Sequence, residues 1–273
     1  MGLVYLDDRI LEEDQISLLT DEGFLYGYGL FETMRSYKGK PFLLEAHIDR
    51  LIDSCSLINL EPPKRSLVIE KTEELLRESK ISDVYIRINY WKTKTSPKFC
   101  IIVREFKPYP KKIYREGLRC VISDFRQNEY SLISKIKSLN YLNNRLALKE
   151  AEEKNADEAI LLNTKGCVCE GSRTNIFLVK DSQILTPSLD CGCLKGITRN
   201  TIIDIAKKEG IGVYEKELLP EDIFTCSEAF LTNSLLEIAP FVYLDKRPIN
   251  RGAPGEITRF LSEKYQRLTL ETE

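Results

Sequence analysis

Hydrophobic residues in the first part of the chain follow two spacings, and each spacing predicts a different kind of element. In residues 84–91 apolar side chains occupy every second position, which is typical of a strand with one buried face. Leu44, Ile48 and Leu51 recur at intervals of four and three, so they predict an amphipathic helix over about 45–57. The same patterns predict a second helix at 66–79 and strands at 2–6, 17–19, 30–37, 41–44 and 99–103.

The second part of the chain alternates short apolar runs with helical patterns, which is typical of a mixed α/β domain. The predicted strands lie at 119–123, 158–163, 175–179, 213–217, 228–232 and 241–244, and the predicted helices at 137–154, 199–208 and 255–267. The irregular stretch 108–112 separates this pattern from the first one. We therefore expect an α/β (α+β) fold with a small N-terminal α/β domain at 1–115 and a larger domain at 116–273.

The balance of charges argues against two classes of partner. The 273 residues include 40 Lys and Arg and 42 Asp and Glu, with a net charge of −2 and no long block of one sign. We therefore expect neither nucleic acid nor an anionic membrane as the main partner. No apolar run approaches the roughly 20 residues of a membrane span, and residues 1–8 lack a secretory pattern, so we expect a cytoplasmic protein.

The eight cysteines predict buried thiols rather than a disulfide framework, because they are dilute and lie mostly in apolar runs. Two pairs, Cys167 with Cys169 and Cys191 with Cys193, could together offer four thiolates to a metal. The cysteines of structural zinc sites are usually separated by two to four residues, and a separation of one is unusual. We therefore expect no metal site.

The chain contains a single histidine, and this scarcity narrows the chemistry available to it. An imidazole cluster for a metal, a Ser/His pair or a Cys/His pair can hardly be built from one histidine. A lysine can act as a Schiff-base nucleophile and as a proton carrier once burial or a neighbouring cation lowers its pKa. Lys137, at the start of a predicted helix, is the candidate for that lysine, although an ordinary exposed lysine is the plainer interpretation of its position alone.

Three further segments supply groups that a pyridoxal phosphate site needs. Glu170 enters an apolar strand and would be part-buried, where a carboxylate needs a positive or protonated partner. The segment 196–198 begins a predicted helix, whose free N–H groups suit a phosphate. Arg50 lies beside the apolar stripe of its helix, from where a guanidinium could reach a phosphate. Taken singly, these features are equally compatible with a turn glutamate, an ordinary helix cap and a surface ion pair.

The order of these motifs resembles the class IV, fold-type IV pyridoxal-phosphate enzymes. This family includes branched-chain and D-amino acid aminotransferases and aminodeoxychorismate lyase. The resemblance extends over nearly the whole chain, and it rests on the segments Asp21–Arg35, His47–Leu51, Lys137–Asn140, Glu170–Gly171, Gly196–Arg199 and Thr232–Ser234.

The resemblance implies a role for each of these groups. Lys137 would form a Schiff base with the cofactor, and Glu170 would pair with the protonated ring nitrogen. The other cofactor-binding residues are expected to be Arg50, Ile197, Thr198 and Ser234 at the phosphate and Tyr141 near the phenolic oxygen. The family also implies a homodimer, a small-molecule amino substrate, and a pseudo-barrel in the larger domain, with the active site between the two domains.

Two reactions are compatible with such a site. Thr33 stands where branched-chain enzymes tend to have Gly, and with the segment Thr232–Ser234 it favours aminodeoxychorismate lyase slightly, which releases pyruvate and 4-aminobenzoate. Transamination of branched-chain or D-amino acids is the alternative, although the Arg-x-His carboxylate trap of D-amino acid enzymes is absent. A cofactor-binding protein without turnover is disfavoured, because the three key side chains at 50, 137 and 170 are intact. For either enzyme the expected substrate-pocket residues are Tyr26, Phe31, Thr33, Arg35 and Arg87.

Overall fold

A four-stranded antiparallel sheet forms the first part of the molecule, which is seen here in a computed structural model that describes residues 3–6, 9–12 and 17–271. The strand order is β4-β3-β5-β6. The four strands are β3 (Gly29–Tyr37), β4 (Lys40–Pro41), β5 (Val84–Trp91) and β6 (Lys98–Glu105). The predicted strands at 30–37, 84–91 and 99–103 are therefore confirmed, whereas the strand at 41–44 is only two residues long.

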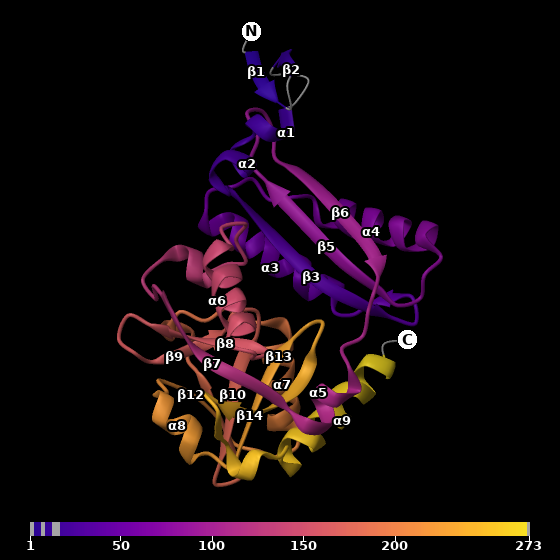
Figure 1. Ribbon diagram of the computed structural model, residues 1–273. Coiled ribbons are helices and arrows are strands. Elements are labelled where there is room, and N and C mark those ends of the chain that lie inside the picture. The colour runs from indigo at the N-terminus through magenta and orange to yellow at the C-terminus, as the bar shows by residue number, and fades with distance from the viewer. Residues whose placement is uncertain (1–2, 7–8, 13–16, 272–273) are drawn as a thin grey trace.

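Two helices, α3 (Leu44–Leu57) and α4 (Arg65–Ser79), cover one face of this sheet, as both helical patterns predict (Figure 1). Leu30 and Met34 of β3 and Ile86 and Ile88 of β5 are buried against them, together with Ile48 of α3. The even-numbered positions of β3 and β5 thus face the helices. Because strand residues alternate between faces, the odd-numbered positions point toward the second part of the molecule.

The N-terminal residues form small separate elements beside this sheet. Strand β1 (Leu3–Leu6) pairs with β2 (Arg9–Glu12), and two short helices follow, α1 (Ser17–Thr20) and α2 (Glu22–Tyr26). The predicted strand at 17–19 is wrong, since α1 occupies that position. Its apolar run is too short for alternation to distinguish a strand from one helical turn.

The second part is built on a nine-stranded mixed sheet within the described residues. Its order is β12-β11-β10-β13-β14-β7-β8-β9, and β15 also pairs with β14. The strands are β7 (Leu118–Gln127), β8 (Glu158–Asn163), β9 (Val168–Gly171), β10 (Asn175–Lys180), β11 (Gln183–Pro187), β12 (Val213–Lys216), β13 (Glu228–Asn233), β14 (Glu237–Leu244) and β15 (Arg247–Pro248). The terminal strand β9 also contacts β10 and β11, so the sheet curls toward closure, as the predicted pseudo-barrel requires.

Five helices accompany this sheet in the described residues: α5 (Lys111–Glu116), α6 (Leu142–Glu153), α7 (Ile197–Lys208), α8 (Pro220–Thr225) and α9 (Glu256–Glu271). Helices α7 and α9 pack on each other and on β13. Strand β8 is buried along its whole length, which is typical of a strand covered on both faces. The predicted helices at 199–208 and 255–267 are confirmed within a few residues. The proposed boundary between residues 115 and 116 stays a prediction, and it falls within the last turn of α5, two residues before β7 begins.

The predicted helix at 137–154 begins five residues too early. Residues 137–139 instead extend along β3: Leu30 and Ser138 form an antiparallel bridge, the Phe31 N–H donates to Lys137 O at 2.8 Å, and the Leu139 N–H donates to Gly29 O at 2.9 Å. Pairing with a strand in the first part of the molecule therefore overrides the local helical pattern. Lys137 is held by this pairing and not by the start of α6.

The cysteines follow the sequence prediction closely. All eight are free, seven are buried, and Cys100 on β6 is exposed. Among the described helices, none has both the length and the apolar composition that crossing a membrane requires.

Candidate active site

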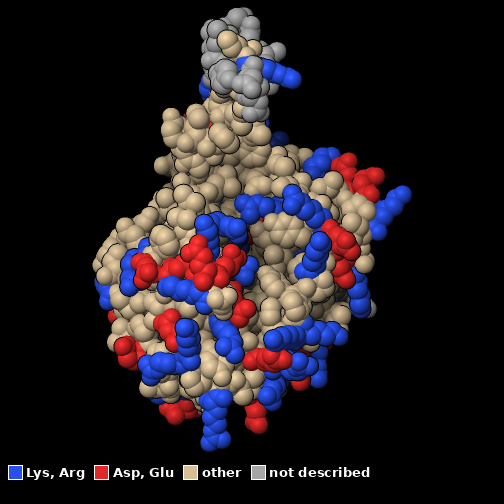
Figure 2. Space-filling model, in the orientation of Figure 1, with Lys and Arg blue, Asp and Glu red and all other residues tan. Residues whose placement is uncertain are grey.

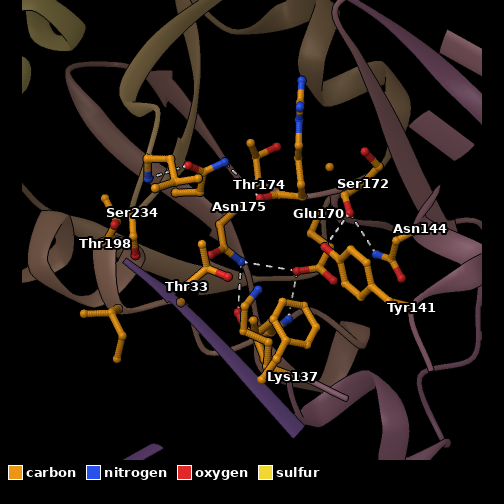
Figure 3. A pocket seen from close by; sticks show the side chains of 18 of the residues that line it. Thr33, Lys137, Tyr141, Asn144, Glu170, Ser172, Thr174, Asn175, Thr198 and Ser234 are labelled. Atoms are coloured by element: carbon orange, nitrogen blue, oxygen red, sulfur yellow. Dashed lines mark hydrogen bonds between the residues drawn. The ribbon is translucent and has the colours of Figure 1, made fainter. Parts of the chain in front are cut away.

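A cavity of about 290 Å³ lies between the two parts of the molecule. Strands β3 and β5 form one wall, and the segments 170–175, 194–198 and 232–235 form the opposite wall. The segment that carries Lys137 closes one side of it. Figure 3 shows Ser234 and Thr198 on one side of this pocket and Glu170 and Tyr141 on the other, an arrangement with two chemically different ends.

Lys137 lies in the cavity with its ammonium group against two aromatic rings. Its Nζ is 4.4 Å from the centroid of the Phe31 ring and 5.6 Å from that of Tyr141. Burial lowers the pKa of Lys137 to about 8, and the cation of Arg50 acts in the same direction. At pH 7 roughly a tenth of the amine is therefore neutral, against less than about a thousandth for an ordinary lysine. The structure thus supplies the nucleophilic lysine that the sequence predicts.

Glu170 is the next-to-last residue of β9, and it is buried at the end of the cavity away from Ser234 and Thr198. The backbone N–H of Leu194 donates to its Oε2 at 2.9 Å, and Asn175 Nδ2 lies 3.4 Å from the same oxygen. Burial raises the pKa of this carboxyl to about 7, although the Leu194 N–H and Lys137 oppose the rise. A protonated nitrogen at the carboxylate would complete its partners and favour the charged form.

The loop after Glu170 is held from behind by a second buried carboxylate, Glu158 on β8. Its Oε1 accepts hydrogen bonds from the backbone N–H and the hydroxyl of Ser172. Ser172 O in turn accepts from Tyr141 Oη at 2.9 Å and from Asn144 Nδ2 at 3.0 Å. Burial raises the pKa of Tyr141, so its phenol stays protonated and occupied by this bond.

The other end of the cavity gathers groups that suit a phosphate. Residues Ile197 and Thr198 open α7, so their backbone N–H groups lack partners within the helix. A Cβ on Gly196, which precedes them, would lie only 2.0 Å from Asn175 Oδ1, so a larger residue there would displace the Asn175 amide. Arg50 from α3 also lines the cavity, and its Nη1 donates to Lys195 O at 3.0 Å.

Ser234 reaches this end of the cavity from the turn between β13 and β14. Asn233 Oδ1 accepts hydrogen bonds from the N–H groups of Leu235 and Leu236, at 2.9 and 2.7 Å, and thereby fixes the turn. The structure therefore brings together all seven of the residues predicted at the cofactor: Arg50, Lys137, Tyr141, Glu170, Ile197, Thr198 and Ser234.

Three of the five predicted substrate-pocket residues line the same cavity. Phe31 and Thr33 are on the odd-numbered face of β3, and Arg87 lies opposite on β5. The guanidinium of Arg87 stacks over the Phe31 ring at 3.9 Å from its centroid, and its Nε donates to Asn89 Oδ1 at 2.8 Å.

The structure does not bring the other two, Tyr26 and Arg35, to the cavity. Tyr26 ends helix α2 and is 70% exposed. Arg35 shares the face of Phe31 and Thr33, but it lies one step further along β3, beyond the end of the pocket. There its Nη1 is 3.2 Å from Glu237 Oε1, which also accepts a hydrogen bond from Tyr37 Oη at 2.7 Å.

Sequence reasoning missed several residues of the site. Asn144, Ser172 and Asn175 hold the loop around Glu170, and Tyr85 lines the cavity beside Arg87. Alternation along β5 places residues 85 and 87 on one face, so it could have identified Tyr85. Glu32 and His47 were also missed, because neither lines the cavity: Glu32 contacts Arg50, and His47 contacts Ser234, both of which do.

Comparison with known proteins accounts for this geometry. The model of the amino-transferase class IV family matches residues 29–243. A putative branched-chain-amino-acid aminotransferase of Methanocaldococcus jannaschii is 37% identical, over 96% of this chain and 95% of the relative. The aminodeoxychorismate lyase of Bacillus subtilis is 34% identical, over 97% of this chain and 94% of the relative.

A solved structure of a branched-chain aminotransferase has the same fold. The branched-chain aminotransferase of Thermoproteus uzoniensis, crystallised with norvaline, superimposes with a TM-score of 0.86 at 33% identity, covering 99% of this chain and 95% of that one. The chain therefore belongs to the class IV aminotransferase family and has the fold of the fold-type IV enzymes. It is a pyridoxal-phosphate-dependent enzyme, as the sequence motifs predict.

The residues in the cavity fit this cofactor. The helix start at 197–198, Arg50 and Ser234 offer donors to a phosphate at one end. The buried carboxylate of Glu170 lies at the other end, where it lacks a cationic hydrogen-bond partner among the described residues. Lys137 lies between the two ends with a lowered pKa.

We predict that the rate at which the apoprotein reacts with pyridoxal 5′-phosphate rises about tenfold per pH unit below pH 8 and levels off above it. The reason is that only the neutral amine of Lys137 attacks an aldehyde, and its pKa is lowered to about 8. Stopped-flow absorbance in the near-visible range measures this rate. Lys137→Ala abolishes the absorbance change, whereas Lys135→Ala, at an exposed position two residues away, leaves it intact. A plateau that begins only near pH 10 would contradict the prediction.

Proposed function

We propose that the protein is an aminotransferase of branched-chain amino acids that exchanges their amino group with a dicarboxylic partner such as glutamate. The names of several relatives support this proposal, and so does the norvaline bound to the enzyme of Thermoproteus uzoniensis. The observation that carries it is the composition of the cavity wall next to Lys137. That wall combines aromatic and aliphatic side chains with one guanidinium.

The apolar part of the wall suits an aliphatic side chain. Phe31, Tyr85, Tyr109 and Ile133 line the cavity, and burial of a leucine or valine side chain against such a surface is favourable by about 1.5–3 kcal/mol. Arg87 stacks on Phe31 and lines the cavity, so its guanidinium can pair with a carboxylate bound there. One pocket thus accepts an apolar side chain and a glutamate side chain in turn, as transamination between them requires.

The side chains around Lys137 have distinct tasks in this reaction. When bound, the cofactor supplies an electron-accepting ring that stabilises negative charge on the substrate's amine-bearing carbon. Lys137 Nζ, with its pKa lowered to about 8, removes the proton from that carbon of the amino donor, and in the second half-reaction it returns a proton to the corresponding carbon of the product amino acid. The carboxylate of Glu170 keeps a proton on the ring nitrogen, and Tyr141 and Asn144 hold the loop behind it through Ser172.

Aminodeoxychorismate lyase activity is the second candidate. Thr33 lines the cavity, and the motifs that contain Thr33 and Ser234 favour this activity. The relative from Bacillus subtilis bears that name. In such a reaction Lys137 would remove the same proton, but pyruvate would leave and no amino acceptor would be needed.

We predict that leucine, isoleucine or valine converts the holoenzyme to its pyridoxamine form in a single turnover, and that 2-oxoglutarate restores the original spectrum. The apolar wall accepts the aliphatic side chain, and Lys137 transfers the proton in each half-reaction. Absorbance spectroscopy follows the conversion without any coupling enzyme. Release of pyruvate from aminodeoxychorismate in the absence of a 2-oxo acid, with no spectral response to branched-chain amino acids, would replace the proposal with the lyase.

We predict that Arg87→Leu raises the KM for glutamate and 2-oxoglutarate about 10- to 100-fold and changes the KM for leucine little. Loss of a charged hydrogen bond of about 1.5–3 kcal/mol gives this ratio. Steady-state kinetics with each substrate measures it. Arg104→Leu, at an exposed position on the neighbouring strand β6, is the matched control and leaves both constants unchanged. Equal losses for leucine and glutamate in Arg87→Leu would exclude a role in dicarboxylate recognition.

We further propose that the protein is a homodimer, because large apolar side chains are exposed in a continuous region. Phe24 and Leu25 on α2 are 64% and 53% exposed, and Tyr26 extends the same surface. Asn140 Nδ2 donates to Gly27 O at 2.9 Å, so this helix adjoins the segment before α6 and the start of α6. Further apolar side chains are exposed on these two segments: Tyr130, Leu132, Ile133, Leu142 and Leu146. In Figure 2 the surface just below the grey atoms carries few charged side chains. Exposed apolar patches of this kind mark protein interfaces.

We predict that Leu25→Asp converts the dimer to a monomer, because it puts a charge into the apolar surface. Sedimentation velocity measures the mass of the particle in solution. The matched control Leu75→Asp, at a half-exposed apolar position on α4, leaves the dimer intact. If the wild-type chain sediments as a monomer at micromolar concentration, the proposed interface is wrong.

A further inference from the structure

Two buried residues, Glu32 and His47, lie behind the phosphate end of the cavity without lining it. Each is only 1% exposed. Glu32 is on the face of β3 that packs against α3, and His47 and Arg50 are one helical turn apart on α3. Glu32 accepts two hydrogen bonds from Arg50, at 2.8 Å from Nε and 2.6 Å from Nη2. His47 Nδ1 lies 2.7 Å from Glu32 Oε2.

The same histidine contacts the second phosphate-facing side chain. Its Nε2 lies 3.3 Å from Ser234 Oγ, on the turn between β13 and β14. The contacts therefore form one chain from Arg50 through Glu32 and His47 to Ser234. Both ends of this chain line the cavity, and its middle is shielded from it.

The ionisation of Glu32 fixes one proton of His47. Burial alone would raise the pKa of Glu32, but Arg50 and the hydrogen bonds from His47 and Arg50 outweigh it and lower the pKa to about 2. An ionised carboxylate can only accept hydrogen bonds, so His47 Nδ1 carries a hydrogen. The charge of His47 therefore depends only on whether Nε2 also carries a hydrogen.

Ser234 has a single hydroxyl hydrogen, and its direction depends on Nε2. If His47 is neutral, Nε2 is an acceptor, so the Ser234 hydroxyl donates to it and offers only a lone pair to the cavity. If Nε2 carries a hydrogen, Ser234 accepts that hydrogen and can donate its own to a phosphate oxygen. A phosphate dianion at this end of the cavity needs a donor and is repelled by a lone pair.

We propose that His47 is a positioning residue that takes up one proton from solvent when the cofactor's phosphate binds, and so turns Ser234 into a phosphate donor. The proton adds to Nε2, and the Ser234 hydrogen turns from Nε2 to a phosphate oxygen. Without the phosphate, burial lowers the pKa of His47, and the cations of Arg50 and Lys137 act in the same direction against Glu32. Among the residues that the structure describes, these three side chains are the charges that act on the imidazole, and they come from β3, α3 and the segment before α6.

The consequence for binding follows from linkage. The phosphate-bound state has the higher His47 pKa, so the contribution of His47 to affinity is complete below the lower of the two pKa values. As pH rises between them, affinity falls about tenfold per pH unit, and above both values the contribution is lost. The titration of Lys137 acts in the opposite direction on covalent attachment, so the test uses a ligand that carries no aldehyde.

The single histidine makes a direct measurement possible. In the full-length untagged protein labelled with ¹⁵N-histidine, long-range ¹H–¹⁵N spectra report the state of one imidazole. At pH 7.5 we expect a neutral, Nδ1-protonated ring in the apoprotein and with pyridoxamine, which lacks a phosphate. With pyridoxamine 5′-phosphate we expect both nitrogens to carry hydrogen. In Ser234→Ala the ring should remain neutral with the same ligand.

Calorimetry supplies a second readout. Titration of pyridoxamine 5′-phosphate in two buffers of different ionisation enthalpy counts the protons taken up. At a pH between the His47 pKa of the free protein and that of the phosphate-bound protein, we expect the wild type to take up about one proton more than His47→Gln. The glutamine amide is a donor at every pH, so this variant needs no proton to donate to Ser234. We also expect His47→Gln to lose the tenfold-per-unit decline in affinity.

The outcomes are distinguishable. This inference rests on the proposed phosphate site, so a failure of pyridoxamine 5′-phosphate to bind the wild type would overturn both. Binding with a neutral His47 ring would overturn the proton uptake alone. An equal rise of the His47 pKa in wild type and Ser234→Ala would overturn the role of Ser234.

Discussion

A short length of backbone pairing between β3 and the segment around Lys137 joins the two parts of the molecule, and the site depends on it. The bridge between Leu30 and Ser138 and the hydrogen bonds on either side of it fix Lys137 at the floor of the cavity. The same strand carries Phe31 and Thr33 into the cavity on one face and Glu32 into the helical layer on the other. Strand β3 thus positions the Lys137 amine, the cavity residues Phe31 and Thr33, and the Glu32 carboxylate that binds Arg50.

The chemistry of the cavity depends on two buried groups of opposite charge, the amine of Lys137 and the carboxyl of Glu170, which lie apart from each other. Burial moves the pKa values of Lys137 and Glu170 toward neutrality from opposite directions, to about 8 and about 7. Each group is therefore close to the point at which it can gain or lose a proton under ordinary conditions. Arg50 and the start of α7 keep the opposite end of the cavity positive, so an anion is favoured there while the lysine remains available as a base.

Sequence patterns gave the local elements and the composition of the site, but not the pairings that assemble it. The spacing of Leu44, Ile48 and Leu51 was sufficient to predict α3, because a helix that packs on a sheet needs an apolar stripe. The early start assigned to α6 was wrong, since the strand-like pairing of residues 137–139 depends on β3, more than a hundred residues away. The resemblance in motif order predicted seven residues at the cofactor, and all seven line one cavity in the structure.

Two of the predicted substrate-pocket residues, Tyr26 on α2 and Arg35 on β3, lie outside the cavity of this chain. Alternation along β3 identifies the face on which Arg35 lies, but it does not say where along the strand the pocket ends. The roles of Glu32 and His47 were likewise hidden, because they require the register of α3 against β3. A pattern within one element can thus place a side chain on a surface, whereas contacts between elements decide what it meets.

The contact of Arg35 with Glu237 has a consequence for how such enzymes can be recombined. Glu237 also accepts a hydrogen bond from Tyr37, and it lies three residues after Ser234, which lines the cavity. Exchange of the first part of this chain for that of a relative would therefore disturb a loop of the second part, even if every cavity residue were retained. A chimera built from this chain would therefore keep residues 35 and 237 from the same parent, so that the ion pair across the two parts is retained.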